Sequence, residues 1–247
     1  MKFSITASSR TGCVRANNED MVLVDQWFIR NGKMSAHIDT SSVDRYLIAL
    51  ADGMGGHSSG EVASSEALHN LQFFFSDLPV GLSISDFNEA IYEWLSSINN
   101  IIDSKGRCEE RLSKMGTTLV AFAYYGGSFY WMNCGDSRIY RFHNDELSQL
   151  STDHSLSSLM GNSEHMNIIT NCIGGGCKSS YMDIVEFTAD VQRDDVYLLC
   201  SDGLSNMLTD EQIRQYLERD CNADMLCFAA EQAGGHDNVS AIVVKVQ

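Results

Sequence analysis

The chain has 247 residues, with 33 Asp and Glu against 17 Lys and Arg, which gives a formal net charge of −16. This length allows a sizeable buried core in one large domain or two small ones. The acidic balance argues against nucleic acid as the main partner, because such binding requires a basic face. A solvated surface accounts for most of the acidity. The remainder suits a carboxylate cluster that is neutralised only when metal is bound.

The eight cysteines show neither paired C-x-x-C spacing nor a zinc pattern. Several lie inside apolar runs, where a free thiol behaves as a small hydrophobic side chain. The N-terminal segment lacks the apolar core of a signal peptide, and no stretch approaches about 18 consecutive apolar residues. We therefore expect a soluble cytoplasmic protein of a reducing compartment, without a membrane span.

The first half of the chain alternates strand patterns with loops and then carries two amphipathic helices. The only proline, Pro79, falls between the helices. In chain order we predict a strand at 2–7, a polar loop at 8–20, strands at 21–29 and 46–51 with a hairpin loop at 31–44 between them, and helices at 59–75 and from about 85 to 102.

The second half is richer in strands, and glycine pairs or Asn-Asp pairs separate them. We predict strands at 117–125, 129–134, 138–142, 147–150, 181–187, 196–200 and 239–246, helices at 209–217 and 223–233, and a loop with a short helical piece at 153–176. Hairpins around a central helix pair indicate an α+β protein with two antiparallel sheets packed face to face and helices outside.

Four aspartates share one local pattern, in which a carboxylate near glycine lies at one end of an apolar strand. The clearest is Asp52, which follows the apolar run 46–51 and precedes Gly53 and two further glycines. The other three are Asp136, Asp202 and Asp237. An isolated Asp-Gly pair is typical of an ordinary turn. Four such sites together indicate a site for hard divalent cations, which prefer oxygen ligands.

This set of residues suits phosphate ester hydrolysis. Two ions roughly 3.5–4 Å apart can lower the pKa of a bridging water and clamp a phosphoryl group during in-line displacement. Arg15 adds a planar guanidinium that can bind two phosphate oxygens.

Taken together, six motifs resemble the metal-dependent serine/threonine protein phosphatases of type 2C, in their compact bacterial form. They lie in the family's order from Gly12 to Asn238. The motifs are Gly12-x-x-Arg15-x-x-Asn18-Glu19-Asp20, Ala51-Asp52-Gly53-Met54-Gly55-Gly56-His57, Met115-Gly116-Thr117-Thr118, Gly135-Asp136-Ser137-Arg138, Ser201-Asp202-Gly203-Leu204 and Gly235-His236-Asp237-Asn238. The resemblance implies a four-layer α-β-β-α sandwich, with two antiparallel sheets flanked by helix pairs, over a single catalytic domain at 1–247.

The resemblance also implies a ligand set for two divalent cations, Mn²⁺ or Mg²⁺. Asp52 corresponds to the ligand that bridges both ions, and the Gly53 carbonyl corresponds to a ligand of the first. Asp202 and Asp237 correspond to ligands of the second ion. Asp136 corresponds to a ligand, shared with Asp202, of a third and weaker ion.

By the same resemblance, Arg15 is the phosphate-binding arginine, and Glu19 and Asp20 act mainly through metal-bound waters. The implied reaction is hydrolysis of phosphoserine and phosphothreonine in proteins by a water activated between the two cations. The implied partners are phosphorylated proteins, the products of a serine/threonine kinase, and the enzyme is expected to be a monomer.

The sequence departs from the family at two points. Some members have a histidine, a proposed general acid, where this chain has Met54, so another group must protonate the leaving alkoxide. His57 and His154 are candidates by location, although a lone histidine is more often structural. The segment that corresponds to the family's mobile flap, Ser155 to Asn171 within 153–176, is short.

Other interpretations remain open at this stage. Arg15 could neutralise its neighbours Glu19 and Asp20, Asp136 could be an ordinary turn residue, and Asp153 could cap a helix. The three glycines at 174–176 indicate a flexible turn, because no P-loop Lys-Ser/Thr follows them. The chain as a whole could be a phosphatase-like binding module without turnover, or a small-molecule phosphatase.

Overall fold

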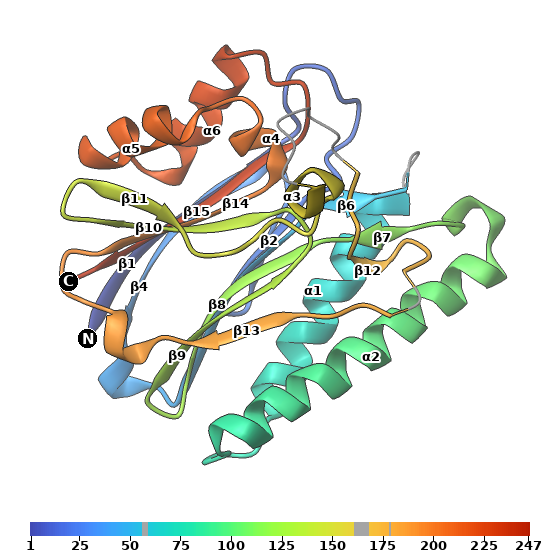
Figure 1. Ribbon diagram of the computed structural model, residues 1–247, viewed down its shortest axis with the longest axis horizontal. Coiled ribbons are helices and arrows are strands. Elements are labelled where there is room, and N and C mark those ends of the chain that lie inside the picture. Colours follow the sequence, from blue (N-terminus) through green and yellow to red (C-terminus); the bar gives the residue numbers. More distant parts are fainter. Residues whose placement is uncertain (56–58, 161–167, 178) are drawn as a thin grey trace.

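The computed structural model describes residues 1–55, 59–160, 168–177 and 179–247, and Figure 1 shows their arrangement. The strands are β1 (Lys2–Arg10), β2 (Met21–Val24), β3 (Trp27–Ile29), β4 (Gly32–Asp39), β5 (Arg45–Ala51), β6 (Gly53–Met54), β7 (Gly116–Thr117), β8 (Leu119–Tyr125), β9 (Ser128–Cys134), β10 (Arg138–His143), β11 (Glu146–Gln149), β12 (Ile173–Gly174), β13 (Asp183–Glu186), β14 (Val196–Cys200) and β15 (Val239–Val246). The helices are α1 (Ser59–Asp77), α2 (Ile84–Cys108), α3 (Leu156–Met160), α4 (Asp202–Ser205), α5 (Asp210–Glu218) and α6 (Ala223–Gln232).

Two antiparallel sheets form the centre of the molecule. One has the strand order β11-β10-β14-β15-β1-β4, and the other has the order β13-β9-β8-β5-β2-β3. Their facing side chains alternate along each strand and form a shared apolar core that includes Phe3, Leu50, Phe122 and Ile242. The first and last strands of the chain pair along their length, with Phe3 opposite Val246.

The helices cover the outer faces of these two sheets, which gives four layers (Figure 1). Helices α1 and α2 bury one face, with Leu68, Leu71 and Ile91, against the sheet that contains β5. Helices α5 and α6 bury Ile213 and Leu226 against the other sheet. The predicted α-β-β-α sandwich is confirmed. None of the described helices is long and apolar enough to cross a lipid bilayer.

The chain between the first strands differs from the sequence prediction. The predicted loop at 31–44 is wrong, because Gly32–Asp39 forms β4, an edge strand that pairs with β1. Its polar residues face outward, while Met34, Ala36 and Ile38 face the central core. The predicted strand at 21–29 is two strands, since Asp25 has a φ of +56° and turns the chain between them.

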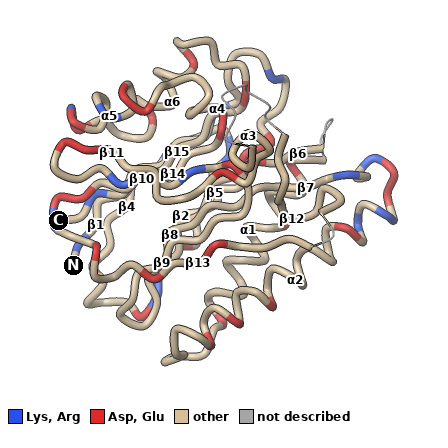
Figure 2. The backbone as a smooth tube through the Cα atoms, viewed as in Figure 1, with Lys and Arg blue, Asp and Glu red and all other residues tan. Residues whose placement is uncertain are grey.

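A third, small sheet of order β12-β7-β6 was not expected from the sequence. It lies beside the end of β5, where Gly53 pairs with Thr117 and Thr117 pairs in turn with Ile173. The segment 153–176 contains helix α3 and strand β12, and its residues 161–167 lie outside the described part of the chain. Acidic positions are spread over the outer helices α2 and α5 (Figure 2), as expected for a solvated acidic surface.

Candidate active site

The site is built around the corner between β5 and β6, where Asp52 lies. Its backbone is fixed on both sides: the Asp52 amide donates to Thr118 Oγ1 at 3.1 Å, and its carbonyl accepts from the Thr118 amide at 2.9 Å. Thr117 Oγ1 donates to the same carbonyl at 2.9 Å. The backbone is therefore satisfied within the sheet, and the partly exposed carboxylate is left to bind another group.

Glycine is required at this corner because two backbones approach closely. A Cβ on Gly53 would lie 2.1 Å from the carbonyl oxygen of Gly60 and 2.6 Å from that of Glu19. A Cβ on Gly60 would in turn lie 2.7 Å from the Gly53 carbonyl oxygen. The first turn of α1 and the N-terminal loop therefore both pack on the residue that follows Asp52.

Strand register brings the other acidic residues to the same end of the sheets. Met21 pairs with Ala51, so Asp20 and Asp52 lie beside each other at the strand ends. In the second sheet, Cys200 pairs with Ala241, and the Ser201 amide donates to the Ser240 carbonyl at 3.1 Å. Asp202, the first residue of α4, and Asp237, just before β15, consequently lie together at the same end of this sheet.

The aspartates at this end of the sheets repel one another. Removal from water raises the pKa of Asp52 well above its ordinary value, and the neighbouring aspartates raise it further. Those neighbours are Asp20, Asp202, Asp136 and Asp237. The pKa of Asp202 is also raised, first by burial and then by Asp237, although Asn206 Nδ2 donates to its carboxylate at 3.1 Å.

Asp20 is fully buried and is only partly satisfied. Ser201 Oγ donates to Asp20 Oδ2 at 2.8 Å, whereas Asp20 Oδ1 has no hydrogen-bond partner among the described residues. Burial raises the pKa of Asp20 to about 7. A buried carboxylate oxygen without a partner is costly and suits a site that receives a cation.

The N-terminal loop brings Arg15 to this cluster. Arg15 Nη2 donates to Asp237 Oδ2 at 2.7 Å, and the side chains of this pair are 54% and 37% exposed. Arg15 therefore forms its ion pair with Asp237, and of its sequence neighbours Glu19 and Asp20 only Glu19 attracts it, at longer range. Burial raises the pKa of Glu19, and the charge of Arg15 acts in the opposite direction.

Asn238 holds the same loop, and the sequence prediction assigned it no role. Its Nδ2 donates to the carbonyls of Thr11 and Asn17, both at 2.9 Å, and its Oδ1 accepts from the Glu19 amide at 2.8 Å. Its position directly after Asp237 in a family motif was the only signal in the sequence. Asn238 therefore positions Glu19 and the loop relative to Asp237.

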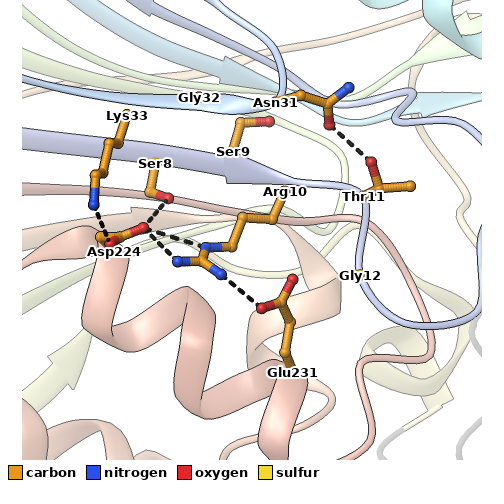
Figure 3. A pocket seen from close by; sticks show the side chains of 10 residues that line it. All are labelled: Ser8, Ser9, Arg10, Thr11, Gly12, Asn31, Gly32, Lys33, Asp224 and Glu231. Atoms are coloured by element: carbon orange, nitrogen blue, oxygen red, sulfur yellow. Dashed lines mark hydrogen bonds and ion pairs between the residues drawn. The ribbon is translucent and has the colours of Figure 1, made fainter.

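A polar cavity of about 470 Å³ lies beside the start of this loop (Figure 3). Inside it, Arg10 bonds to Asp224 at 2.6 Å and to Glu231 at 2.7 Å, and Lys33 bonds to Asp224 at 2.9 Å. Hydrogen bonds from Lys33 and Arg10 lower the pKa of Asp224 to about 2. These opposite charges neutralise one another, and their ion pairs hold β1 and β4 against α6.

Asp136 lies in the turn between β9 and β10 and is 8% exposed. Burial raises its pKa to about 7, and the charge of Asp202 adds to this effect. The preceding residue, Gly135, has a φ of +124°, and its amide donates to His154 Nδ1 at 3.1 Å. A turn residue that is both buried and close to Asp202 differs from an ordinary exposed turn aspartate.

His154 has a structural role, which disfavours it as a general acid. Its Nε2 bonds to Asp183 at 3.0 Å, and its backbone amide donates to the Gly135 carbonyl at 2.9 Å. His57, the other histidine candidate, lies outside the described residues. Asp153 pairs with Arg138 at 2.7 Å, and Ser155 Oγ, not Asp153, accepts from the Ser158 amide at the start of α3, so the interpretation of Asp153 as a helix cap is wrong.

The acidic cluster is not preassembled as a coordination sphere. Within the described ranges of the chain, no three His, Cys, Asp or Glu side chains already converge as metal ligands. The bonds of Asp237 to Arg15 and of Asp202 to Asn206 explain part of this, because each holds a carboxylate oxygen. The donor chemistry nevertheless fits hard divalent cations, since like-charged carboxylates lie together with an oxygen of Asp20 that has no hydrogen-bond partner in the described part of the chain.

A family model, described as Protein phosphatase 2C, matches residues 35–232 of this chain. The serine/threonine phosphatase stp of Listeria innocua is 30% identical over 95% of this chain and 92% of that protein. The chain belongs to the protein phosphatase 2C family. PstP of Mycobacterium tuberculosis is 31% identical over 97% of this chain, which corresponds to 44% of PstP.

Solved structures of protein phosphatase 2C enzymes share this fold. A serine/threonine phosphatase of S. agalactiae superposes with a TM-score of 0.83 at 26% identity and covers 99% of this chain and 100% of that chain. The catalytic domain of PstP, solved in complex with two manganese ions, superposes with a TM-score of 0.75 at 30% identity over the whole of both chains.

Proposed function

We propose that this protein hydrolyses phosphoserine and phosphothreonine in proteins with the help of two divalent cations, Mn²⁺ or Mg²⁺. The observation that carries the proposal is the convergence of Asp20, Asp52, Asp202 and Asp237 at one end of the two sheets, where burial and the charges of neighbouring carboxylates raise the pKa of Asp20, Asp52 and Asp202. Membership of the family and the two manganese ions of the PstP structure support it. The chain serves as one catalytic domain, which the pairing of β1 with β15 supports.

Each acidic residue has a proposed role in holding metal. Asp52 would bridge the two ions, the Gly53 carbonyl would complete the first site, and Asp202 and Asp237 would hold the second. Asp136, with Asp202, would hold a third and weaker ion. When bound, the cations supply positive charge that acidifies a water nucleophile and neutralises phosphoryl oxygens. Glu19 and Asp20 would form an outer shell around them.

Arg15 is proposed to bind the phosphate of the substrate. It lies on an exposed loop and pairs with Asp237 through one nitrogen. With Asp237 engaged in holding a cation, the Arg15 guanidinium would be free to bind two phosphate oxygens. Asn238 keeps the loop in reach, because it holds both ends of the segment from Thr11 to Glu19.

The leaving alkoxide must also receive a proton. Met54 has no acidic proton, and His154 is bonded to Asp183 and Gly135. We therefore assign this proton to a water held near Asp136. The change Asp136→Ala should slow phosphopeptide turnover more than turnover of p-nitrophenyl phosphate, whose leaving group needs little protonation. Equal losses on both substrates would remove this role.

The proposed partners are phosphorylated proteins produced by a serine/threonine kinase, and the proposed working form is a cytoplasmic monomer. Relatives that are named serine/threonine phosphatases support the substrate class. The formal net charge of −16 is unfavourable for contact with nucleic acid or with anionic membranes.

The deciding experiment compares phosphate release from a phosphothreonine peptide and from a phosphotyrosine peptide. We expect manganese-dependent release from the phosphothreonine peptide only, and none in excess EDTA. Asp237→Asn is the matched variant: it removes a ligand charge at nearly constant volume, so it should abolish turnover while the protein stays folded. Release that persists in EDTA would contradict metal dependence. Hydrolysis of small phosphate esters without peptide turnover would favour a small-molecule phosphatase.

A further inference from the structure

Two cysteines that the proposed function does not use lie against each other beside the small sheet. Cys172 precedes β12 and Cys177 follows the glycine turn, and their Sγ atoms are 3.0 Å apart. Both thiols are free. A disulfide has an S–S distance of about 2.05 Å, so bond formation requires an approach of about 1 Å.

The turn between the cysteines favours this approach. Gly174, Gly175 and Gly176 have φ values of +73°, +62° and +84°, a left-handed run that folds the chain back. The Cys177 amide donates to the Gly174 carbonyl at 2.9 Å, which closes the turn.

The surroundings hold the turn in this arrangement. Asn99 of α2 donates to the Cys177 carbonyl at 3.2 Å and accepts from the Gly174 amide at 2.7 Å. One helix side chain therefore binds both ends of the turn. The two thiols consequently meet through the fold and not only through their closeness in sequence.

The two thiols differ in access to solvent. Cys172 is 3% exposed, whereas Cys177 is half-buried and can meet a small solute. Burial raises the pKa of Cys172, and the neighbouring Cys177 raises it further. Since the thiolate is the reactive form, Cys177 is the sulfur that reacts first and Cys172 the one that follows.

We propose that Cys172 and Cys177 form a redox modification site, which a hydroperoxide oxidises to a reversible disulfide. In the first step the Cys177 thiolate attacks one peroxide oxygen and the O–O bond breaks. This leaves a sulfenic acid on Cys177 and an alkoxide or hydroxide that takes up a proton. In the second step the Cys172 sulfur attacks the Cys177 sulfur, the S–O bond breaks, and the departing hydroxide leaves as water with the thiol proton of Cys172. The two sulfurs together lose two electrons, which reduce the peroxide.

The site is connected to the metal-binding corner by backbone pairing. Strand β12 pairs with β7, and β7 pairs with β6, which contains Gly53. A Cβ on Gly116 of β7 would lie 2.7 Å from the Gly175 amide nitrogen, so the turn and the sheet are in tight contact. Oxidation therefore closes a disulfide-bonded ring that packs against the small sheet, and strand β6 of this sheet directly follows Asp52.

The test treats the folded 247-residue protein with hydrogen peroxide and measures intact mass, followed by mapping of linked peptides. We expect a mass loss of two hydrogen atoms, a linked peptide that joins Cys172 to Cys177, and full reversal by dithiothreitol. The disulfide should also raise the Tm, because it restricts the unfolded chain. Cys108→Ser is the matched control, since it removes an exposed thiol elsewhere and should leave this result unchanged.

Two variants separate the steps. In Cys172→Ala, Cys177 should stop at the sulfenic acid, which dimedone traps. In Cys177→Ser, the buried Cys172 should stay unmodified. The proposal is overturned if the folded wild type yields no peptide linking Cys172 to Cys177 at peroxide doses that oxidise Cys108. It is also overturned if Cys177 advances irreversibly to the sulfinic acid, or bonds to a different cysteine.

Discussion

Replacement of Asp136 by Asn should make the metal-free protein more stable at about pH 8, although it removes a residue of the proposed site. The carboxyl group is 8% exposed, and burial raises its pKa from 3.8 to about 7. The folded protein therefore holds a proton up to about pH 7, which the unfolded chain releases near pH 3.8. Since the unfolded state then binds fewer protons than the folded state, stability falls as the pH rises between these values.

The magnitude follows from the size of the shift. A difference of about 3 pKa units corresponds to about 4 kcal/mol of lost stability above pH 7. Water and counter-ions that reach the site screen this charge, so we expect about half of it, roughly 2 kcal/mol. For a chain of this length that is a Tm increase of about 4–8 °C in Asp136→Asn. At about pH 4.5 the carboxyl group is protonated in the fold, and the gain should fall below about 1 kcal/mol.

The assay is thermal unfolding in EDTA at both pH values, with Asp153→Asn as the control. The Asp153 carboxylate pairs with Arg138 at 2.7 Å, so its loss should destabilise the protein at about pH 8, the opposite sign. Saturating manganese should reverse the order of wild type and Asp136→Asn, because the carboxylate then has a cation to bind. An Asp136→Asn protein that is no more stable than wild type at about pH 8, or that gains equally at both values, would refute the reasoning.

Three further predictions test other parts of the site. Arg15→Ala should raise the KM for a phosphopeptide by roughly 10-fold or more and lower kcat less, because a charge-assisted hydrogen bond to phosphate is lost. Steady-state kinetics equal to wild type would instead leave Arg15 as a counter-ion of Asp237. His154→Ala should lower the free energy of unfolding by about 2 kcal/mol in a denaturant titration, because the side chain stabilises the turn around Gly135. Turnover at low temperature should be retained. Loss of turnover in a fully folded variant would restore His154 as a catalytic candidate. Gly53→Ala should abolish phosphatase activity and lower the Tm, because its Cβ would lie 2.1 Å from a backbone oxygen. The control variant Gly32→Ala should be tolerated, because its Cβ would lie 3.5 Å from the nearest atom. Equal Tm values for the two variants would show that the backbone at the β5–β6 corner can relax.

Much of the fold could be predicted because the signals are local. The last strand was predicted as 239–246 and forms Val239–Val246, and the helices of both outer layers begin and end within one or two residues of their predicted bounds, except that α2 continues to Cys108, six residues beyond its predicted end. Apolar periodicity reports which side of an element faces the core, and a core-facing side is what makes the element stable. Strand β4 was missed since it is an edge strand whose outer face carries Lys33, Ser35 and His37.

The sequence by itself determined which acidic residues stand at strand ends and to which family they point. Only the tertiary structure decided how they meet: register places Asp20 beside Asp52, Ser201 bonds to Asp20, and Arg15 bonds to Asp237. These partners lie 32 to 222 positions apart in the chain. Their contacts follow from strand pairing and sheet packing, and no local pattern of residue types reports these. For the same reason, the ion pair of Arg15 with Asp237 is visible only in the folded chain.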